Sequence, residues 1–178
     1  PNSLIQGPSS QMGFIAGREL MRLKWKYFYS RDLPLIATQN NAVHDSLENE
    51  SSIGHLPINL YLTEHALTTQ VARVCKEKFD WELAVDLDCE FEIGGSLAAT
   101  QKWDQRWDTL TGIVDTTAKY LKDELKRDTP ASEMKKFEHN LGIMSKLRMS
   151  EVRADLKADV YPSTRMNLDK QLVKELSL

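Results

Sequence analysis

The stretch FDWELAVDLDCEFEIGG, which runs from Phe79 to Gly95, decides the expected fold because its side chains alternate between two kinds. Its odd positions are apolar as far as Ile93, and its even positions are acidic except at Ala84. Successive side chains of an extended chain point to opposite faces, so the pattern predicts a half-buried β-strand over 79–93 with an acidic outer face. An α-helix would spread the same apolar residues around its whole circumference.

A strand over 79–93 needs a partner, because buried backbone N–H and C=O groups require hydrogen bonds. Such a strand would span roughly 50 Å, whereas most strands have about five or six residues. No second run of comparable alternation occurs in the chain. Three outcomes are open: pairing with a strand of another protein, self-pairing in a dimer, or a bend into two shorter paired pieces. Strand addition is an established mode of recognition, and the missing partner strand favours an interaction protein.

The rest of the chain is expected to be helical, so the predicted fold class is mainly α, with several amphipathic helices and one long extended β segment at 79–93. Loop residues are expected around Pro34, a short helical turn over 46–53, and a helix start at Pro57 and again at Pro130. The predicted organisation has four parts: an irregular N-terminal tail (1–11), a helical region (12–78), the alternating strand (79–95) and a helical C-terminal extension (96–178). A last helix of that extension is expected to carry Leu168, Leu172 and Leu176.

Composition limits the classes of function. Apolar residues make up 41% of the chain and charged residues 28%, as in ordinary soluble globular proteins. The net charge of −3 argues against a general nucleic-acid binder, and we expect no nucleic-acid partner. No apolar run approaches the roughly 20 residues that span a bilayer. Two cysteines make no disulfide framework and predict reduced thiols in an intracellular compartment.

Two functional hypotheses apply to the carboxylates of the alternating stretch: a calcium site and a catalytic site. Asp86, Asp88 and Glu90 lie at alternate positions, but an EF-hand loop starting at Asp86 would need a glycine where Phe91 stands. An enzyme that uses these carboxylates stays an alternative without a base, nucleophile or metal ligand beside them. We therefore predict no metal and no cofactor.

The histidines and cysteines form no catalytic or zinc-binding spacing. His44, His55, His65 and His139 make no H-x-x-x-H pair, and Cys75 and Cys89 are too far apart for half of a zinc knuckle. Cys89 belongs to the apolar side of the predicted strand, where a buried and inert thiol is expected. No catalytic residue is predicted, so the protein is expected not to be an enzyme.

The segment GRELMRLKWKYFYSR (17–31) interleaves basic and aromatic residues. Arg18, Arg22 and Lys26 form a basic stripe at a spacing of four on a predicted helix, and Phe14, Met21, Trp25 and Phe28 lie on another side of it. Such a helix fits a membrane surface, an acidic protein or a stacked single-stranded nucleic acid, and it also fits an ordinary core helix with a solvated basic side. We predict contact of Arg18, Arg22 and Lys26 with a membrane surface or an acidic partner.

The order of features from Gly13 to Lys76 resembles a family of subunits of mitochondrial ubiquinol–cytochrome c oxidoreductase (complex III), often called subunit 7 or the ubiquinone-binding protein subunit. KWKYFYSRDLPLI is similar to the aromatic helix end and loop of that family. HDSLENESSIGHLPINLY is similar to its acidic link and its "LP" turn, and TEHALTTQVARVCK falls where its long helix would be. Basic residues in that helix are sparse here, and everything after Gly95 would be an extension.

The resemblance implies a non-catalytic subunit, peripheral to the matrix side of the mitochondrial inner membrane, that contacts cytochrome b and the core subunits and supports assembly and stability. The expected function is accordingly that of an accessory subunit of a membrane-associated assembly. The alternative is a self-contained protein-binding module, or a homodimer through the 79–93 strand. The side chains predicted to contact a partner are Trp25, Tyr27, Phe28, Leu56, Pro57, Leu60, Tyr61, Trp81, Leu83, Val85, Leu87 and Phe91.

Overall fold

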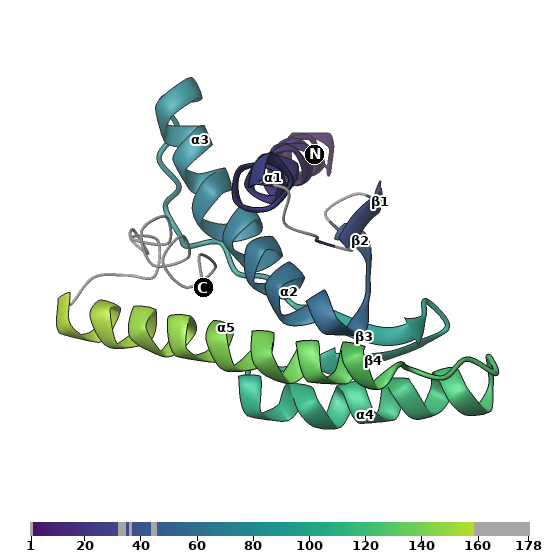
Figure 1. Ribbon diagram of the computed structural model, residues 1–178. Coiled ribbons are helices and arrows are strands. Elements are labelled where there is room, and N and C mark those ends of the chain that lie inside the picture. Colours follow the sequence, from purple (N-terminus) through teal and green to yellow (C-terminus); the bar gives the residue numbers. More distant parts are fainter. Residues whose placement is uncertain (1, 32–34, 36, 44–45, 159–178) are drawn as a thin grey trace.

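The computed structural model describes residues 2–31, 35, 37–43 and 46–158, with side chains from residue 10 to residue 150 except near the gaps. The fold is mainly α, as predicted, with two small antiparallel hairpins (Figure 1). The predicted single strand over 79–93 is wrong. Helix α3 ends at Phe79, and the strand β3 covers only Phe91–Ser96 and pairs with a strand of the same chain. The predicted helix at Leu168, Leu172 and Leu176 lies outside the described residues.

Helix α1 (Asn2–Tyr27) begins within the segment predicted to be an irregular tail. It turns Ala16, Leu20, Leu23 and Tyr27 toward the interior, where all four are buried. Phe14, Met21 and Trp25 lie on the opposite face and are exposed. The core-facing side of α1 is therefore opposite the face that carries these three large apolar residues.

The first hairpin, β1 (Ala37–Val43) with β2 (Ser46–Ser51), replaces the loop and the helical turn predicted for this region. Its residues are mostly polar and have a low intrinsic preference for strands. Tertiary packing holds it, because Ala37 is buried and Leu47 packs against the core. A register shift interrupts the ladder between Gln39 and Asn41.

A nearly continuous helix crosses the middle of the molecule. It consists of α2 (Leu56–His65), a π-helical turn (Ala66–Gln70) and α3 (Val71–Phe79). Pro57 lies in the first turn, as predicted. Residues 57–66 are all buried, which identifies α2 as a helix surrounded by protein on all sides. Asp80 ends α3 in the left-handed conformation at φ 50°.

The second hairpin, β3 with β4 (Ala99–Trp103), packs on α4 (Trp107–Asp123). The spacing of four between Trp103 and Trp107 predicts one helix, but Trp103 ends β4 and Trp107 begins α4, with ring centroids 5.2 Å apart. Phe91 lies 5.7 Å from Trp103 and Tyr61 6.5 Å from Trp107, so this aromatic cluster joins the hairpin and α4 to α2.

Helix α5 (Ala131–Ala158) runs beneath α2 (Figure 1). Phe137, Met144 and Leu147, whose spacing in the sequence predicts one apolar face of a helix, are all buried. The first turn of α5 is tied to the loop before α2, since the Gly54 N–H donates to the Glu133 carboxylate at 3.1 Å and Asn140 donates to the Gly54 carbonyl at 2.8 Å. Two contacts far apart in the sequence thus position α2 over α5.

Candidate partner-binding surfaces

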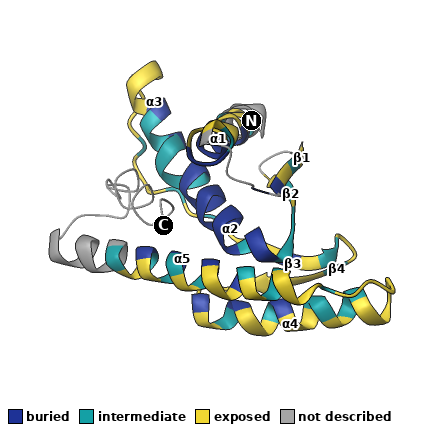
Figure 2. Cartoon of the chain, viewed as in Figure 1, coloured by how far each residue is buried: buried dark blue, intermediate teal, exposed yellow. Residues whose placement is uncertain are grey.

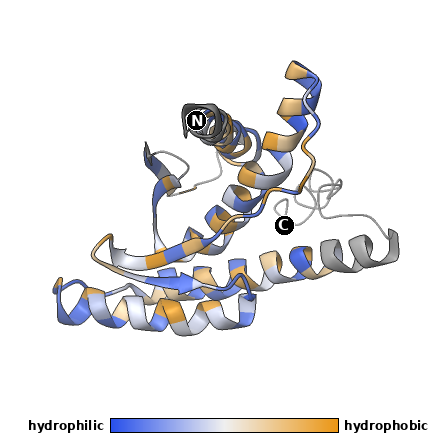
Figure 3. Ribbon diagram, turned by 180° about the vertical axis from the view of Figure 1, so that it is seen from behind, coloured by the Kyte–Doolittle hydropathy of each residue, from blue (hydrophilic) through white to orange (hydrophobic). Residues whose placement is uncertain are grey.

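Residues 80–90, here called the arm, connect α3 to β3 without belonging to a helix or a strand. Seen from behind, the arm runs alongside α3 and α2 (Figure 3). The Trp81 N–H donates to the Cys75 carbonyl at 3.1 Å, and Lys76 pairs with Glu82 at 2.9 Å. These contacts fix the start of the arm to the end of α3.

In the arm, the alternation of apolar and acidic residues corresponds only in part to an alternation of buried and exposed side chains. Leu83, Leu87 and Cys89 are half-buried, and Leu87 packs against a small cluster that contains Val71. The chain bends at residues 84 and 85, and this bend turns Val85 outward to 76% exposure. The outcome is closest to the third one left open by the sequence, a bend into two pieces, of which only the second ends in a paired strand.

The backbone of residues 83–87 forms no hydrogen bond with another backbone group of the described chain. The reason is the length of β4, which ends at Trp103 and is separated from the start of α4 at Trp107 by residues 104–106 alone. Gln105 contributes the last contact on this side, a side-chain bond to the Cys89 carbonyl. The arm therefore continues the line of β3 beyond the point at which its partner strand stops.

The outward side chains of the arm are acidic. Glu90, next to β3, pairs with Lys102 of β4 at 2.8 Å, and Glu92 accepts a hydrogen bond from Thr100 at 2.9 Å. Further out, Asp86 is exposed and has no ion-pair partner among the described residues. Trp81 is 41% exposed at the other end of the arm. The arm thus offers an open backbone, acidic groups and two apolar side chains on its surface.

A second candidate surface is the outer face of α1, defined by Phe14, Arg18, Met21, Arg22, Trp25 and Lys26. All six side chains are exposed. Figure 2 shows exposed residues along this side of α1 and along the arm. Trp25 lies edge-on to Tyr29 at 6.4 Å, and the Lys26 ammonium lies 5.0 Å from the centre of the Tyr27 ring.

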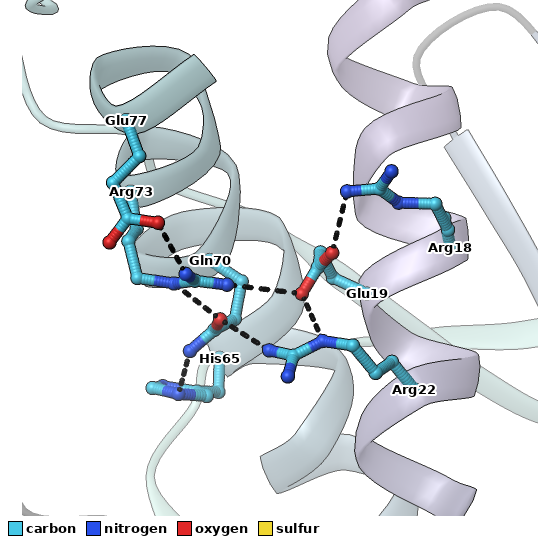
Figure 4. A network of polar contacts seen from close by, with 7 residues as sticks. All are labelled: Arg18, Glu19, Arg22, His65, Gln70, Arg73 and Glu77. Atoms are coloured by element: carbon cyan, nitrogen blue, oxygen red, sulfur yellow. Dashed lines mark hydrogen bonds and ion pairs between the residues drawn. The ribbon is translucent and has the colours of Figure 1, made fainter.

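A polar network holds two of these arginines in place (Figure 4). The Glu19 carboxylate is 2% exposed and accepts from Arg22 at 2.7 Å, from Arg18 at 2.9 Å and from Arg73 of α3 at 3.4 Å. Gln70 accepts from Arg22 and Arg73 and contacts His65 at 2.8 Å. The network joins α1 to the π-helical turn and α3.

Burial acts to raise the pKa of Glu19, but the hydrogen bonds and positive charges of Arg22 and Arg18 outweigh it and hold this pKa below its ordinary value. Glu19 is therefore ionised at neutral pH. Arg73 also pairs with a second carboxylate, Glu77 of α3, at 2.7 Å. The network therefore contains three arginines and two carboxylates, which leaves it with a net positive charge. Glu19 was not among the residues predicted from the sequence, although it is an acid one residue from Arg18 and three residues from Arg22.

Six side chains predicted to contact a partner lie instead in the interior of the chain. They are Tyr27, Phe28, Pro57, Leu60, Tyr61 and Phe91. Leu56 is half-buried and packs against the same core. Helix α5 and the second hairpin pack against α2, while α1 packs against α2, the π-helical turn and the first hairpin, so these six side chains contact residues of their own chain. Trp25, Trp81 and Val85 stay at the surface.

Neither cysteine forms a disulfide, and Cys75 is buried while Cys89 is half-buried. Burial raises the pKa of the Cys75 thiol, which disfavours the reactive thiolate. Within the described ranges, no group of three His, Cys, Asp or Glu side chains is placed to hold a metal ion. No helix in that part of the chain is long and apolar enough to cross a bilayer.

No protein-family model, curated protein or solved structure matches this chain. The proposal for the function of this chain therefore depends on the chain's own residues and geometry.

Proposed function

We propose that this protein is a non-catalytic subunit that acts by binding other proteins in a membrane-associated assembly, with the arm as its main contact. The observation that carries this proposal is the unpaired backbone of residues 83–87, together with the exposed side chains of Val85 within this segment and of Trp81 just before it. Backbone groups at an open edge are a ready template for a strand of another chain.

The charges of the arm favour a particular class of partner. Next to the hairpin, Glu90 pairs with Lys102 at 2.8 Å, and within the ladder Lys102 lies opposite another acid, Glu92. A strand that continues this arrangement would place basic residues at alternate positions opposite Asp86 and Asp88, and such opposite charges stabilise cross-strand pairs. The partner is accordingly an extended segment with alternating basic side chains.

The acidic charges of the arm also disfavour the homodimer through the 79–93 strand, which was the alternative left open by the sequence. Two antiparallel copies paired about Ala84 would place Glu82 opposite Asp86, and a parallel in-register pair would place each acid opposite its own copy. Like charges directly opposite each other destabilise a strand pair. Self-pairing through the arm is therefore disfavoured at neutral pH.

The resemblance over 13–76 suggests complex III, on the matrix side of the mitochondrial inner membrane, as the assembly. The order of elements agrees with it in kind: a helix with an aromatic end, a link, the Leu56-Pro57 turn and a long helix. Tyr27, Phe28 and Pro57 pack inside this chain. A relationship through these residues would be one of shared local fold, with the arm as an addition that makes its own contacts.

Site-specific photo-crosslinking in native membranes tests the proposal. The variant Val85→p-benzoylphenylalanine should yield one main heteromeric product, and the matched variant Lys119→p-benzoylphenylalanine on the exposed side of α4 should not. Charge reversal by Asp86→Lys and Asp88→Lys should abolish the product, whereas Asp115→Lys and Glu138→Lys should leave it unchanged. A product that is only a dimer of this chain, or none specific to position 85, would contradict the proposal. Co-migration of the product with complex III on a native gel tests the proposed assembly.

A further inference from the structure

The outer face of α1 is a continuous surface stripe that the arm does not explain. Phe14 is 68% exposed, Trp25 64% and Met21 47%. Their spacing of seven and four places them in one line along the helix, directly opposite the buried Leu20 and Leu23. A line of large apolar side chains exposed to water is unusual on a helix whose opposite face is already packed against the core.

The charged residues beside this line are all cations. Arg18 is 67% exposed and Arg22 49%, and Lys26 follows one turn later. The only acidic residue of α1, Glu19, is buried under the stripe. By accepting from both arginines, Glu19 fixes their stems on the surface while the surplus positive charge stays exposed.

We propose that the outer face of α1 lies on an anionic membrane surface, parallel to the bilayer plane. Aromatic and apolar side chains on one line with cations beside them define an interfacial helix. Trp25, stacked edge-on against Tyr29, would sit at the level of the headgroups, where amphipathic rings are favoured. Arg18, Arg22 and Lys26 would contact lipid phosphates and acidic headgroups. This inference does not depend on the arm or on its protein partner.

An acidic protein is the competing occupant of this face. The straight and narrow line of large apolar residues favours the bilayer, because such residues enter the boundary between headgroups and acyl chains without needing a complementary groove. The absence of any exposed acid on the described part of α1 gives the face one sign of charge along its length.

The test is co-sedimentation of the full chain with vesicles of phosphatidylcholine alone and of phosphatidylcholine mixed with phosphatidylserine. Binding is expected only to the anionic vesicles and should weaken as salt is added. Each cation near such a surface contributes roughly a fivefold factor in partitioning, so Arg18→Gln combined with Lys26→Gln should reduce binding roughly 25-fold. The variant leaves Arg22 and Arg73 on Glu19 and should keep the fold, which circular dichroism and a thermal melt verify. The control Lys119→Gln with Lys122→Gln, on the exposed side of α4, removes the same charge and should bind normally.

Fluorescence quenching by brominated lipid identifies the inserted ring. Trp25→Phe should keep most of the binding but lose most of the quenching, whereas Trp81→Phe, at an exposed site on the arm, should lose neither. Absence of binding to anionic vesicles, or equal loss in the α4 control, would overturn the proposal. If the protein binds no vesicles but this face of α1 crosslinks to an acidic protein, and Arg18→Gln with Lys26→Gln removes that crosslink, the membrane proposal would be overturned in favour of the acidic protein. Because Val85 lies outside α1, the crosslinking result for the arm is independent of these outcomes.

Discussion

Replacement of Lys24 by methionine should stabilise the protein. Lys24 is fully buried, and its ammonium donates a single hydrogen bond, to the Ala37 carbonyl at 3.3 Å. Among the described residues no carboxylate pairs with it. Burial lowers the pKa of Lys24 from 10.5 to about 8, because the interior disfavours the charged form.

The size of the effect follows from this pKa. A decrease from 10.5 to about 8 corresponds to about 3 kcal/mol of cost for the charged lysine at neutral pH. Lys24→Met keeps a side chain of similar length and loses one hydrogen bond, worth about 1 kcal/mol. The Ala37 carbonyl keeps the hydroxyl of Tyr29 as a donor at 3.4 Å. The variant should therefore be about 2 kcal/mol more stable at pH 7.

Urea denaturation of both proteins between neutral and alkaline pH provides the assay. Below pH 8 the lysine is charged in both the folded and the unfolded state, so its full cost is present. Above pH 8 the folded state releases the proton while the unfolded state keeps it, so the wild type gains stability as pH rises. The advantage of Lys24→Met should shrink toward zero by about pH 9.5. The exposed control Lys119→Met should differ little from the wild type at any pH. A variant that is less stable at pH 7, with no pH dependence of the difference, would refute this reasoning.

Three further changes have expected outcomes that denaturation measurements check. Glu19→Gln should lower the free energy of unfolding by about 2 kcal/mol, because the arginines around it lose their buried counter-charge. Since the folded-state pKa of Glu19 is lowered, its contribution is complete above pH 4.5 and should be lost as pH falls below that value, so the variant should show a weaker acid dependence than the wild type. Gly94→Ala should cost about 2 kcal/mol or more, because a Cβ at this position would overlap the Ala99 carbonyl across the hairpin. Gly112→Ala, in the exposed interior of α4 with no atom near the added methyl, should instead stabilise by about 0.5–1 kcal/mol; equal effects of the two glycine changes would contradict the described packing.

The helices were predictable because their apolar residues recur at helical spacing. The face of α5 that carries Phe137, Met144 and Leu147 is buried as expected. The first hairpin was not predictable, since its polar residues lack the alternation of a half-buried strand and its packing depends on core contacts of Ala37 and Leu47. The alternation of 79–93 misled because periodicity cannot reveal that the available partner, β4, is only five residues long.

The sequence predicted the composition of the candidate surfaces, but it did not predict how their side chains are arranged. The basic stripe of Arg18 and Arg22 and the exposed Trp25 are where the sequence places them on α1. Helical spacing places Phe14 and Met21 on one side of α1 with Trp25, but it does not reveal that this side is exposed while Leu20 and Leu23 on the opposite side are buried. Buried charges such as Glu19 depend on groups more than fifty residues away in the chain, and no local pattern reveals such contacts.

Amide hydrogen exchange of residues 83–87 tests the central claim, that the arm leaves its backbone open for a partner. In the protein alone, these amides should exchange at nearly the rate of an unstructured peptide, while those of Phe91 and Ile93 in β3 are protected. In the assembly isolated through the Val85 crosslink, the arm amides should become protected as well. Protection of residues 83–87 equal to that of β3 in the protein alone would contradict the claim, because the arm would then be satisfied by its own chain.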